Sequence, residues 1–247
     1  MKTWRVATTF FAALGLAACG GDFESIGKPN SGQSGKVRLV NATSANILLD
    51  LYDSGSALQA SVPIYGASSY SSLATGSRTL TVRNSGSAAA IATATVTAAR
   101  DDHQAVVAYS SGSGTAATVL SETDAAPAAG TAKLRILNTA DGGSVDVYVV
   151  TTTCAVNATA TTPAFASAVG SNVTAYVAAP ASASATASRV CITGAGARTD
   201  LRADITSLAF TDQRIVTLIL VRPSAGVLKA LALDQQAAPP TFLPSTP

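Results

Sequence analysis

The chain is poor in the residues from which catalytic and metal sites are built. It has one histidine, three cysteines and 12% charged residues. A Ser-His-Asp arrangement would have to use His103, beside Asp101 and Asp102, as its base. The G-x-S-x-G sequence that carries the nucleophile of many hydrolases does not occur. We therefore place His103 in a turn before a strand over 105–109 and expect no catalytic residues. A hydrolase that relies on His103 or on surface carboxylates is the alternative.

Clusters of basic residues are also absent. The chain has 16 Lys+Arg and 14 Asp+Glu, and Lys2 and Arg5 belong to an N-terminal segment that we expect to be removed. The remaining chain is then neutral, which is not the electrostatic footprint of a nucleic-acid-binding protein. The glycine-containing stretch 194–198 lacks the third glycine and the helix of a phosphate-binding loop. We predict a β-turn there, and no nucleic-acid partner or small-molecule cofactor.

A targeting signal occupies the first residues. Lys2 and Arg5 precede an apolar run over 6–16, and the sequence Leu-Ala-Ala-Cys ends at Cys19. A basic start, a short apolar run and small residues before a cleavage site are typical of secretory signal peptides. The run has about half of the roughly 20 residues that are needed to span a bilayer. With cysteine after the cleavage site, the segment resembles the lipobox of bacterial lipoproteins. An ordinary signal peptide with a chance cysteine and a single transmembrane anchor are the alternatives.

The lipobox resemblance implies that Cys19 becomes the N-terminus and carries acyl chains such as palmitate. Several buried acyl chains anchor a protein stably in a lipid bilayer. Gly20 follows, whereas in enteric bacteria an aspartate there marks retention in the inner membrane, so we expect an outer-membrane location facing the periplasm or the cell surface. The stretch 20–35 is rich in Gly, Ser, Pro and Asn and has too few apolar residues for a core. We predict a flexible tether.

The body has the pattern of β-strands. Apolar and polar residues alternate at 36–39, 47–52 and 144–149, which is the period of half-buried strands. Further β-rich runs lie at 78–83, 91–97, 104–109, 117–120, 173–177, 189–193, 215–222 and 227–233. Many short strands without intervening helices indicate an all-β fold of antiparallel β-sandwiches, immunoglobulin-like or transthyretin-like.

An internal duplication divides the body in two. Lys36-Val-Arg-Leu-Val-Asn41 repeats as Lys133-Leu-Arg-Ile-Leu-Asn138, and Leu49-Asp-Leu-Tyr52 repeats as Val145-Asp-Val-Tyr148. The offset between the copies grows from 96 (146 − 50) to 111 (188 − 77), which predicts a 15-residue insertion in the second copy. A repeat of this length indicates two tandem domains rather than a solenoid.

These motifs resemble the bacterial family called domain of unknown function 4397. The resemblance covers nearly all of 36–237 and includes the glycine turn Ala74-Thr-Gly-Ser-Arg78 and the start of a second copy at Gly130-Thr-Ala-Lys133. The family commonly has histidine where Asn41 and Asn138 stand. It implies a structural module and offers no established activity.

Cys154 and Cys191 flank the predicted insertion. In an oxidising compartment the default for such a pair is a disulfide, which in the chain-entropy model would contribute roughly 4 kcal/mol. A redox-active or metal-binding pair is the alternative, although no CxxC spacing is present.

Two carboxylates, Asp141 and Asp146, could supply oxygen ligands to calcium, which needs six or more. We favour a hairpin turn there and expect no metal. Arg38 with Asp50, and Arg135 with Asp146, recur in both copies, and we expect each to form a cross-strand ion pair on a solvent-exposed face.

Together the sequence predicts a non-enzymatic envelope lipoprotein that acts as a binding or structural module. Its partners would be the bilayer, through acylated Cys19, and an envelope protein or glycan. The expected organisation is a signal peptide 1–18, a tether 19–35, module 1 at 36–126, a linker 127–130, module 2 at 131–237 and a disordered tail 238–247.

Overall fold

The computed structural model describes residues 34–140, 143–150, 153–154, 162–181, 188–222, 228–235, 241–243 and 245–246. The predicted signal peptide, Cys19 and most of the predicted tether lie outside these residues. The last two tether residues are described and belong to the first strand, which begins at Ser34. The described part of the chain contains no helix that is long and apolar enough to cross a membrane.

The described residues form β-strands, and helices are absent from them. The first module contains β1 (Ser34–Ala42), β2 (Leu48–Asp53), β3 (Ser56–Pro63), β4 (Ser71–Ala74), β5 (Gly76–Asn84), β6 (Ala90–Ala98), β7 (His103–Ser111) and β8 (Gly114–Ser121). The second module contains β9 (Thr131–Asn138), β10 (Val145–Val150), β11 (Phe165–Ala168), β12 (Val177–Pro180), β13 (Ser188–Gly194), β14 (Ala197–Leu208), β15 (Ile215–Val221), β16 (Lys229–Asp234), β17 (Thr241–Leu243) and β18 (Ser245–Thr246).

Each module is a sandwich of two sheets with the same strand order. The first pairs β4-β1-β7-β8 with β3-β2-β5-β6, and the second pairs β12-β9-β15-β16-β17 with β11-β10-β13-β14-β18. Strands β1 to β8 therefore correspond one by one to β9 to β16. The predicted all-β fold of two antiparallel sandwiches is confirmed. Each module also contains one parallel pair, β1 with β7 and β9 with β15.

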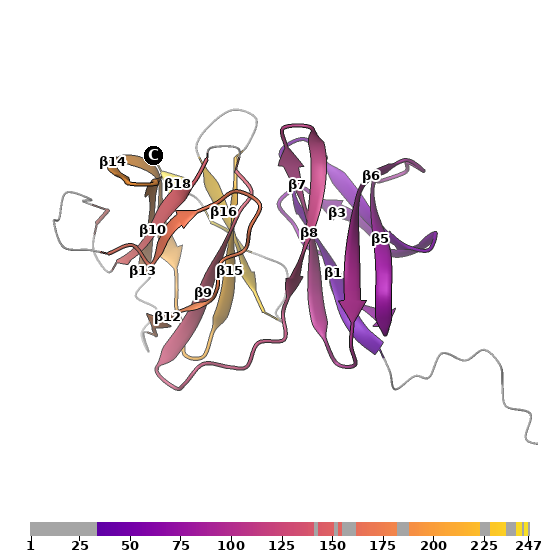
Figure 1. Ribbon diagram of the computed structural model, residues 1–247, viewed down its shortest axis with the longest axis horizontal. Helices are drawn as coiled ribbons and strands as arrows, with labels where there is room; N and C mark the ends of the chain where they lie inside the picture. The colour runs from indigo at the N-terminus through magenta and orange to yellow at the C-terminus, as the bar shows by residue number, and fades with distance from the viewer. Residues whose placement is uncertain are drawn as a thin grey trace, which may run out of the picture.

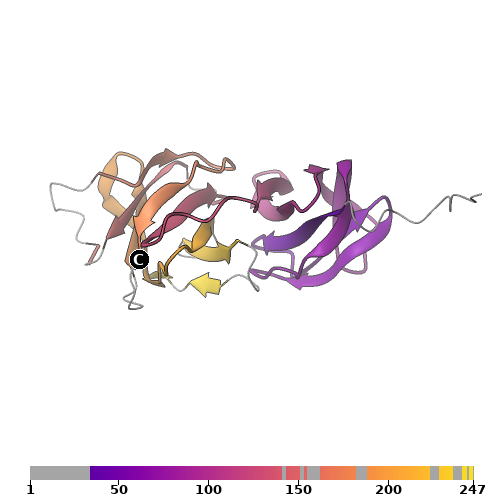
Figure 2. The same cartoon turned by 90° about the horizontal axis from the view of Figure 1, so that it is seen from below.

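The four sheets stack as successive layers along the long axis of the molecule (Figure 1). The turned view keeps the two modules beside each other along that axis (Figure 2). The sheets that contain β1 and β9 are the two central layers. This layering explains why β1 is apolar on both faces: Val37 and Leu39 point into the core of the first sandwich, whereas Val40 and Ala42 pack toward the second module.

In both modules a buried asparagine stabilises the connection that leads from one sheet of the sandwich to the other. The Asn41 side-chain amide donates to the carbonyls of Asn46 and Val62, at 3.0 and 3.2 Å. Asn138 donates in the same way to Gly143 and Ala168, each at 3.1 Å. In each module the amide thus satisfies one carbonyl of the connection that follows the strand and one carbonyl of the edge strand β3 or β11.

The aspartate of the second repeated motif binds backbone rather than arginine. Asp50 accepts the N–H of Ser61 at 2.7 Å, and Asp146 accepts the N–H of Ser167 at 2.7 Å. Both serines have left-handed backbone angles, φ 55° and 50°, so the carboxylate stabilises an irregular edge strand. The predicted ion pairs of these aspartates with Arg38 and Arg135 are wrong. The arginines lie on β1 and β9, and the aspartates lie on β2 and β10 of the opposite sheets.

The predicted insertion in module 2 is divided between two connections. Between Ser61 and Ser167, which bind equivalent aspartates, the offset is 106 (167 − 61), which places 10 extra residues before β11. In the next strands, β5 and β13, Val82 pairs with Leu51 and Ile192 pairs with the equivalent Val147. The offset between Val82 and Ile192 is therefore 110 (192 − 82). The insertion therefore has 14 residues rather than the predicted 15. The prediction aligned the repeated Ser-Arg pairs at 77–78 and 188–189, whereas the paired strands of the structure align one residue away from that match.

The tail predicted to be disordered contributes strands. β17 pairs with β16, and β18 pairs with β14. Leu243 lies in the core of the second sandwich with 3% of its surface exposed. The proline content of the tail suggested disorder, but the described residues between the prolines add to two sheet edges.

Replacing Leu243 by alanine is expected to lower the free energy of unfolding by about 2–5 kcal/mol, because a large buried side chain is lost. Urea denaturation followed by circular dichroism measures this. Ile47→Ala is the control: its side chain is 73% exposed, and the change should stay within about 0.5 kcal/mol. A Leu243→Ala protein as stable as the parent would show that the tail is not part of the folded module.

Candidate functional site

The two body cysteines form the predicted disulfide. Cys154 is joined to Cys191 across 37 residues of chain. Cys191 is on β13, opposite Tyr148 of β10, and Cys154 lies in the longer part of the insertion. The disulfide therefore ties the insertion to the centre of a sheet. Cys19, the predicted lipidation site, lies outside the described residues.

His103 is the first residue of β7 rather than part of the preceding turn. Its ring meets the Tyr70 ring edge-on with centroids 4.9 Å apart, and its Nδ1 is buried without a hydrogen-bond partner. The neighbouring carboxylates have other partners: Asp102 accepts the N–H of Ala99 at 3.0 Å, and Asp101 pairs with Arg100 at 3.4 Å. These contacts do not assemble the base and orienting acid of a hydrolase.

Asp146, a candidate calcium ligand, contacts the glycine-containing stretch 194–198 in the hairpin between β13 and β14. Asp146 uses both carboxylate oxygens on backbone, accepting from Ser167 and, at 2.9 Å, from Gly196. Gly196 is in the tight turn between β13 and β14, with φ 69°, as predicted for the stretch 194–198. Asp141 lies outside the described residues. Within the described residues, groups of three or more His, Cys, Asp or Glu that could hold a metal ion are absent.

The most extensive arrangement of functional groups lies between the modules. The facing sheets bury a shared apolar cluster, made by Val40, Ala42, Ala105, Val107, Tyr109 and Leu120 from the first module and by Leu137, Ile219, Val221, Leu231 and Leu233 from the second. Burial of each such Val, Leu or Ile side chain contributes about 1.5–3 kcal/mol. The two modules thus share a core in addition to their own.

Arg38 is a charged residue inside this interface. It is 1% exposed and forms an ion pair with Glu122, to which it donates from two nitrogens. Its guanidinium lies 4.8 Å from the centre of the Tyr70 ring, and Tyr70 also donates to Glu122 at 2.7 Å. A further N–H of Arg38 crosses to the second module and donates to the Asp234 carbonyl at 2.8 Å.

Arg135 makes the reciprocal contact from the second module. It donates to the Ser121 carbonyl at the end of β8, at 2.6 Å, and to the Thr217 hydroxyl at 2.8 Å. Its guanidinium lies 4.5 Å from the centre of the Tyr176 ring. Burial of the Tyr176 hydroxyl raises its pKa, and nearby Arg135 partly opposes that rise. Arg38 thus binds the end of β16, and Arg135 binds the end of β8, each in the other module.

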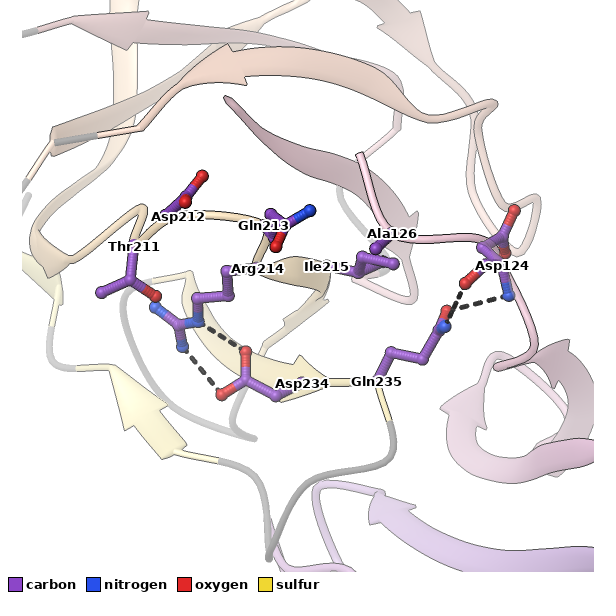
Figure 3. Close-up of a pocket in the computed structure, with 9 residues that line it drawn as sticks. All are labelled: Asp124, Ala126, Thr211, Asp212, Gln213, Arg214, Ile215, Asp234 and Gln235. Atoms are coloured by element: carbon purple, nitrogen blue, oxygen red, sulfur yellow. Dashed lines mark hydrogen bonds and ion pairs between the residues drawn. The ribbon is translucent and has the colours of Figure 1, made fainter. Parts of the chain in front are cut away.

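A cavity of about 520 Å³ lies beside this interface, where the chain passes from one module to the next. Figure 3 shows its lining, from Asp124 and Ala126 of the connection to the 211–215 turn and the end of β16. Arg214 binds Asp234 through two hydrogen bonds of 2.6 and 2.9 Å. Gln235 holds the backbone of Asp124, donating at 2.7 Å. Gln235 therefore fastens the connection to the second module, whereas Arg214 and Asp234 bind each other within that module.

Sequence reasoning did not identify this interface. It placed Arg38 and Arg135 on solvent-exposed faces and gave no role to Glu122, Tyr70 or Tyr176. One signal was present: each arginine is repeated in a strand whose apolar residues fall on both faces, as in Val37-Arg-Leu-Val40. Such a strand is covered on both sides, and an arginine within it must find its partners inside the protein.

The first module and the start of the second match the model of a known family. Residues 35–148 match the model of a domain of unknown function, DUF4397, and this stretch runs from β1 into β10. No curated protein matches the chain. Among solved structures, the chain is similar to the crystal structure of a proposed cell adhesion protein from Bacteroides uniformis. The two share 11% identity and a TM-score of 0.26 over 85% of this chain and 100% of that chain. Residues 35–148 therefore carry the family match, and it brings no assigned activity.

Glu122→Gln is expected to lower the free energy of unfolding by about 3 kcal/mol or more, because Arg38 would remain buried without its counter-charge. Chemical denaturation measures the loss. Asp101→Asn is the matched control, since Asp101 and its partner Arg100 are 85% and 69% exposed, and it should cost at most about 1 kcal/mol. Equal effects of the two substitutions would contradict the importance of the buried pair.

Proposed function

We propose that this chain is a non-enzymatic, outer-membrane-anchored lipoprotein whose two modules form a binding or structural unit of the bacterial cell envelope. In this proposal the acyl chains of Cys19 anchor the protein, residues 20–33 form the tether, and the modules are held away from the lipid surface. The second module is a diverged second copy of the family domain found in the first.

The observation that carries the proposal is a disulfide-linked body behind a lipobox. Disulfides persist in oxidising compartments outside the cytoplasm, and Cys154 and Cys191 are joined. The Leu-Ala-Ala-Cys sequence that ends at Cys19 supplies the route to such a compartment. The equal strand order of the two modules supports the duplication.

The contacts of the polar side chains favour a binding or structural role over catalysis. Arg38 and Arg135 bind carbonyls of the opposite module, and Gln235 binds the connection between the modules. Side chains fixed in this way support a rigid scaffold on which loops and strand edges are displayed. Binding modules commonly place their recognition surfaces on such loops and edges.

Metabolic labelling with an alkyne palmitate analogue tests the anchor in bacterial cells that express the full chain. We expect label on the parent protein in the outer-membrane fraction, and an unlabelled, membrane-free protein for Cys19→Ser. The double variant Cys154→Ser/Cys191→Ser is the control and should keep its label. Label on the Cys19→Ser protein, or a parent protein that stays in the cytoplasm, would contradict the proposal. Protease added to intact cells then distinguishes a surface location, where the body is digested, from a periplasmic one.

A further inference from the structure

The four sheets have eight edge strands in the described structure, and six of them are short or irregular. β4, β11 and β12 have four residues each, and β17 and β18 have three and two. β3 is longer, but its pairing with β2 shifts register twice, Ser61 has φ 55°, and the strand ends at Pro63. Short length, irregular backbone and proline are the usual means by which proteins prevent edge strands from pairing with other chains.

The two remaining edges, β6 and β8, are long strands, and the only irregularity in their described pairing is one register shift in β6, opposite Val82 and Arg83 of β5. β6 has nine residues, Ala-Ile-Ala-Thr-Ala-Thr-Val-Thr-Ala, and β8 has eight, Gly-Thr-Ala-Ala-Thr-Val-Leu-Ser. Neither contains a charged residue or a proline. The pairing of β8 with β7 is regular along its whole length. The two strands lie next to each other on one side of the first module (Figure 1).

The second module covers the equivalent side with its own chain. Its β14 and β16 correspond to β6 and β8, and the C-terminal strands β18 and β17 are added to them. In the first module the residues after β8 instead form the connection to β9. Among the described residues, one edge pair is thus covered by further strands and the other is not.

Burial of the core-facing side chains reflects this difference. In β16, Ala230 and Ala232 are 0% and 1% exposed. The corresponding residues of β8, Ala117 and Val119, pack on the core of the first sandwich but are only partly buried. An additional strand beside β8 would complete the burial of these side chains, as β17 does for β16.

We propose that β6 and β8 form a self-association surface, at which β6 pairs antiparallel with β6 of a second copy of this chain and the two β8 strands come alongside. In a two-fold symmetric dimer each strand pairs with the same strand of the other copy. An uncharged strand therefore meets no like-charge repulsion at this contact. The Ala and Thr residues of β6 meet this condition. Charges that would select a different partner are absent from both strands. The proposal does not depend on lipidation.

Sedimentation velocity of the mature chain, with Cys19 replaced by serine to remove the lipid, tests the proposal. We expect a reversible dimer at micromolar concentrations. Thr95→Lys is expected to weaken dimerisation about tenfold or more, because it places like charges close together across the paired β6 strands. Thr95 is exposed in the single chain, so the variant should keep the circular dichroism spectrum and thermal midpoint of the parent.

Thr79→Lys is the matched control. Thr79 is also exposed and lies directly opposite Thr95 on β5, so it adds the same charge one strand away from the edge and should leave the dimer intact. A chain that stays monomeric at every concentration overturns the proposal. So does a dimer that is equally stable in the parent and in Thr95→Lys, since a different surface would then mediate it.

Discussion

The structure depends on the burial of both faces of its two central sheets. The sheets of β1 and β9 each contribute one face to a sandwich core and the other to the apolar cluster between the modules. Arg38 and Arg135 lie within these doubly covered sheets, and a buried guanidinium is costly unless its donors are satisfied. Part of that satisfaction comes from carbonyls of the opposite module. The position of one module therefore determines whether the other module's arginine is paired, which makes the two sandwiches a single unit.

The two sandwiches share their strand order and several internal contacts, and they differ at their ends. Asn41 and Asn138 make equivalent contacts, and Asp50 and Asp146 each accept the N–H of the equivalent serine, so the two sandwiches have these internal supports in common. The two modules differ at their C-terminal ends because the chain continues differently from each. After β8 the chain leads to the next module, whereas after β16 it returns to cover two edges. The insertion of the second module carries Cys154 and is tied to the sheet by a disulfide, which is the default stabilisation in an oxidising compartment.

Much of the fold could be predicted from sequence, because a strand with one buried face leaves a period-two pattern. Alternation marked β1, β2 and β10, whereas the runs that became β5, β6, β7, β13, β15 and β16 were identified by their β-rich composition. The disulfide followed from the number of cysteines and the expected export of the chain. The run at 173–177 was wrong: Val173 makes an isolated bridge and β12 begins at Val177. β14, with charged residues at Asp200 and Arg202, gave no apolar signal. The inter-module site escaped prediction because its partners, such as Arg38 and Glu122, are separated by 84 residues, and local pattern does not report which sheets face each other.

Differential scanning calorimetry of the intact chain tests the central claim most directly. If the shared cluster and the reciprocal arginines join the sandwiches into one cooperative unit, a single transition is expected, with equal calorimetric and van't Hoff enthalpies. Two transitions with separate midpoints, each accounting for part of the enthalpy, would show that the modules unfold independently and would contradict the account.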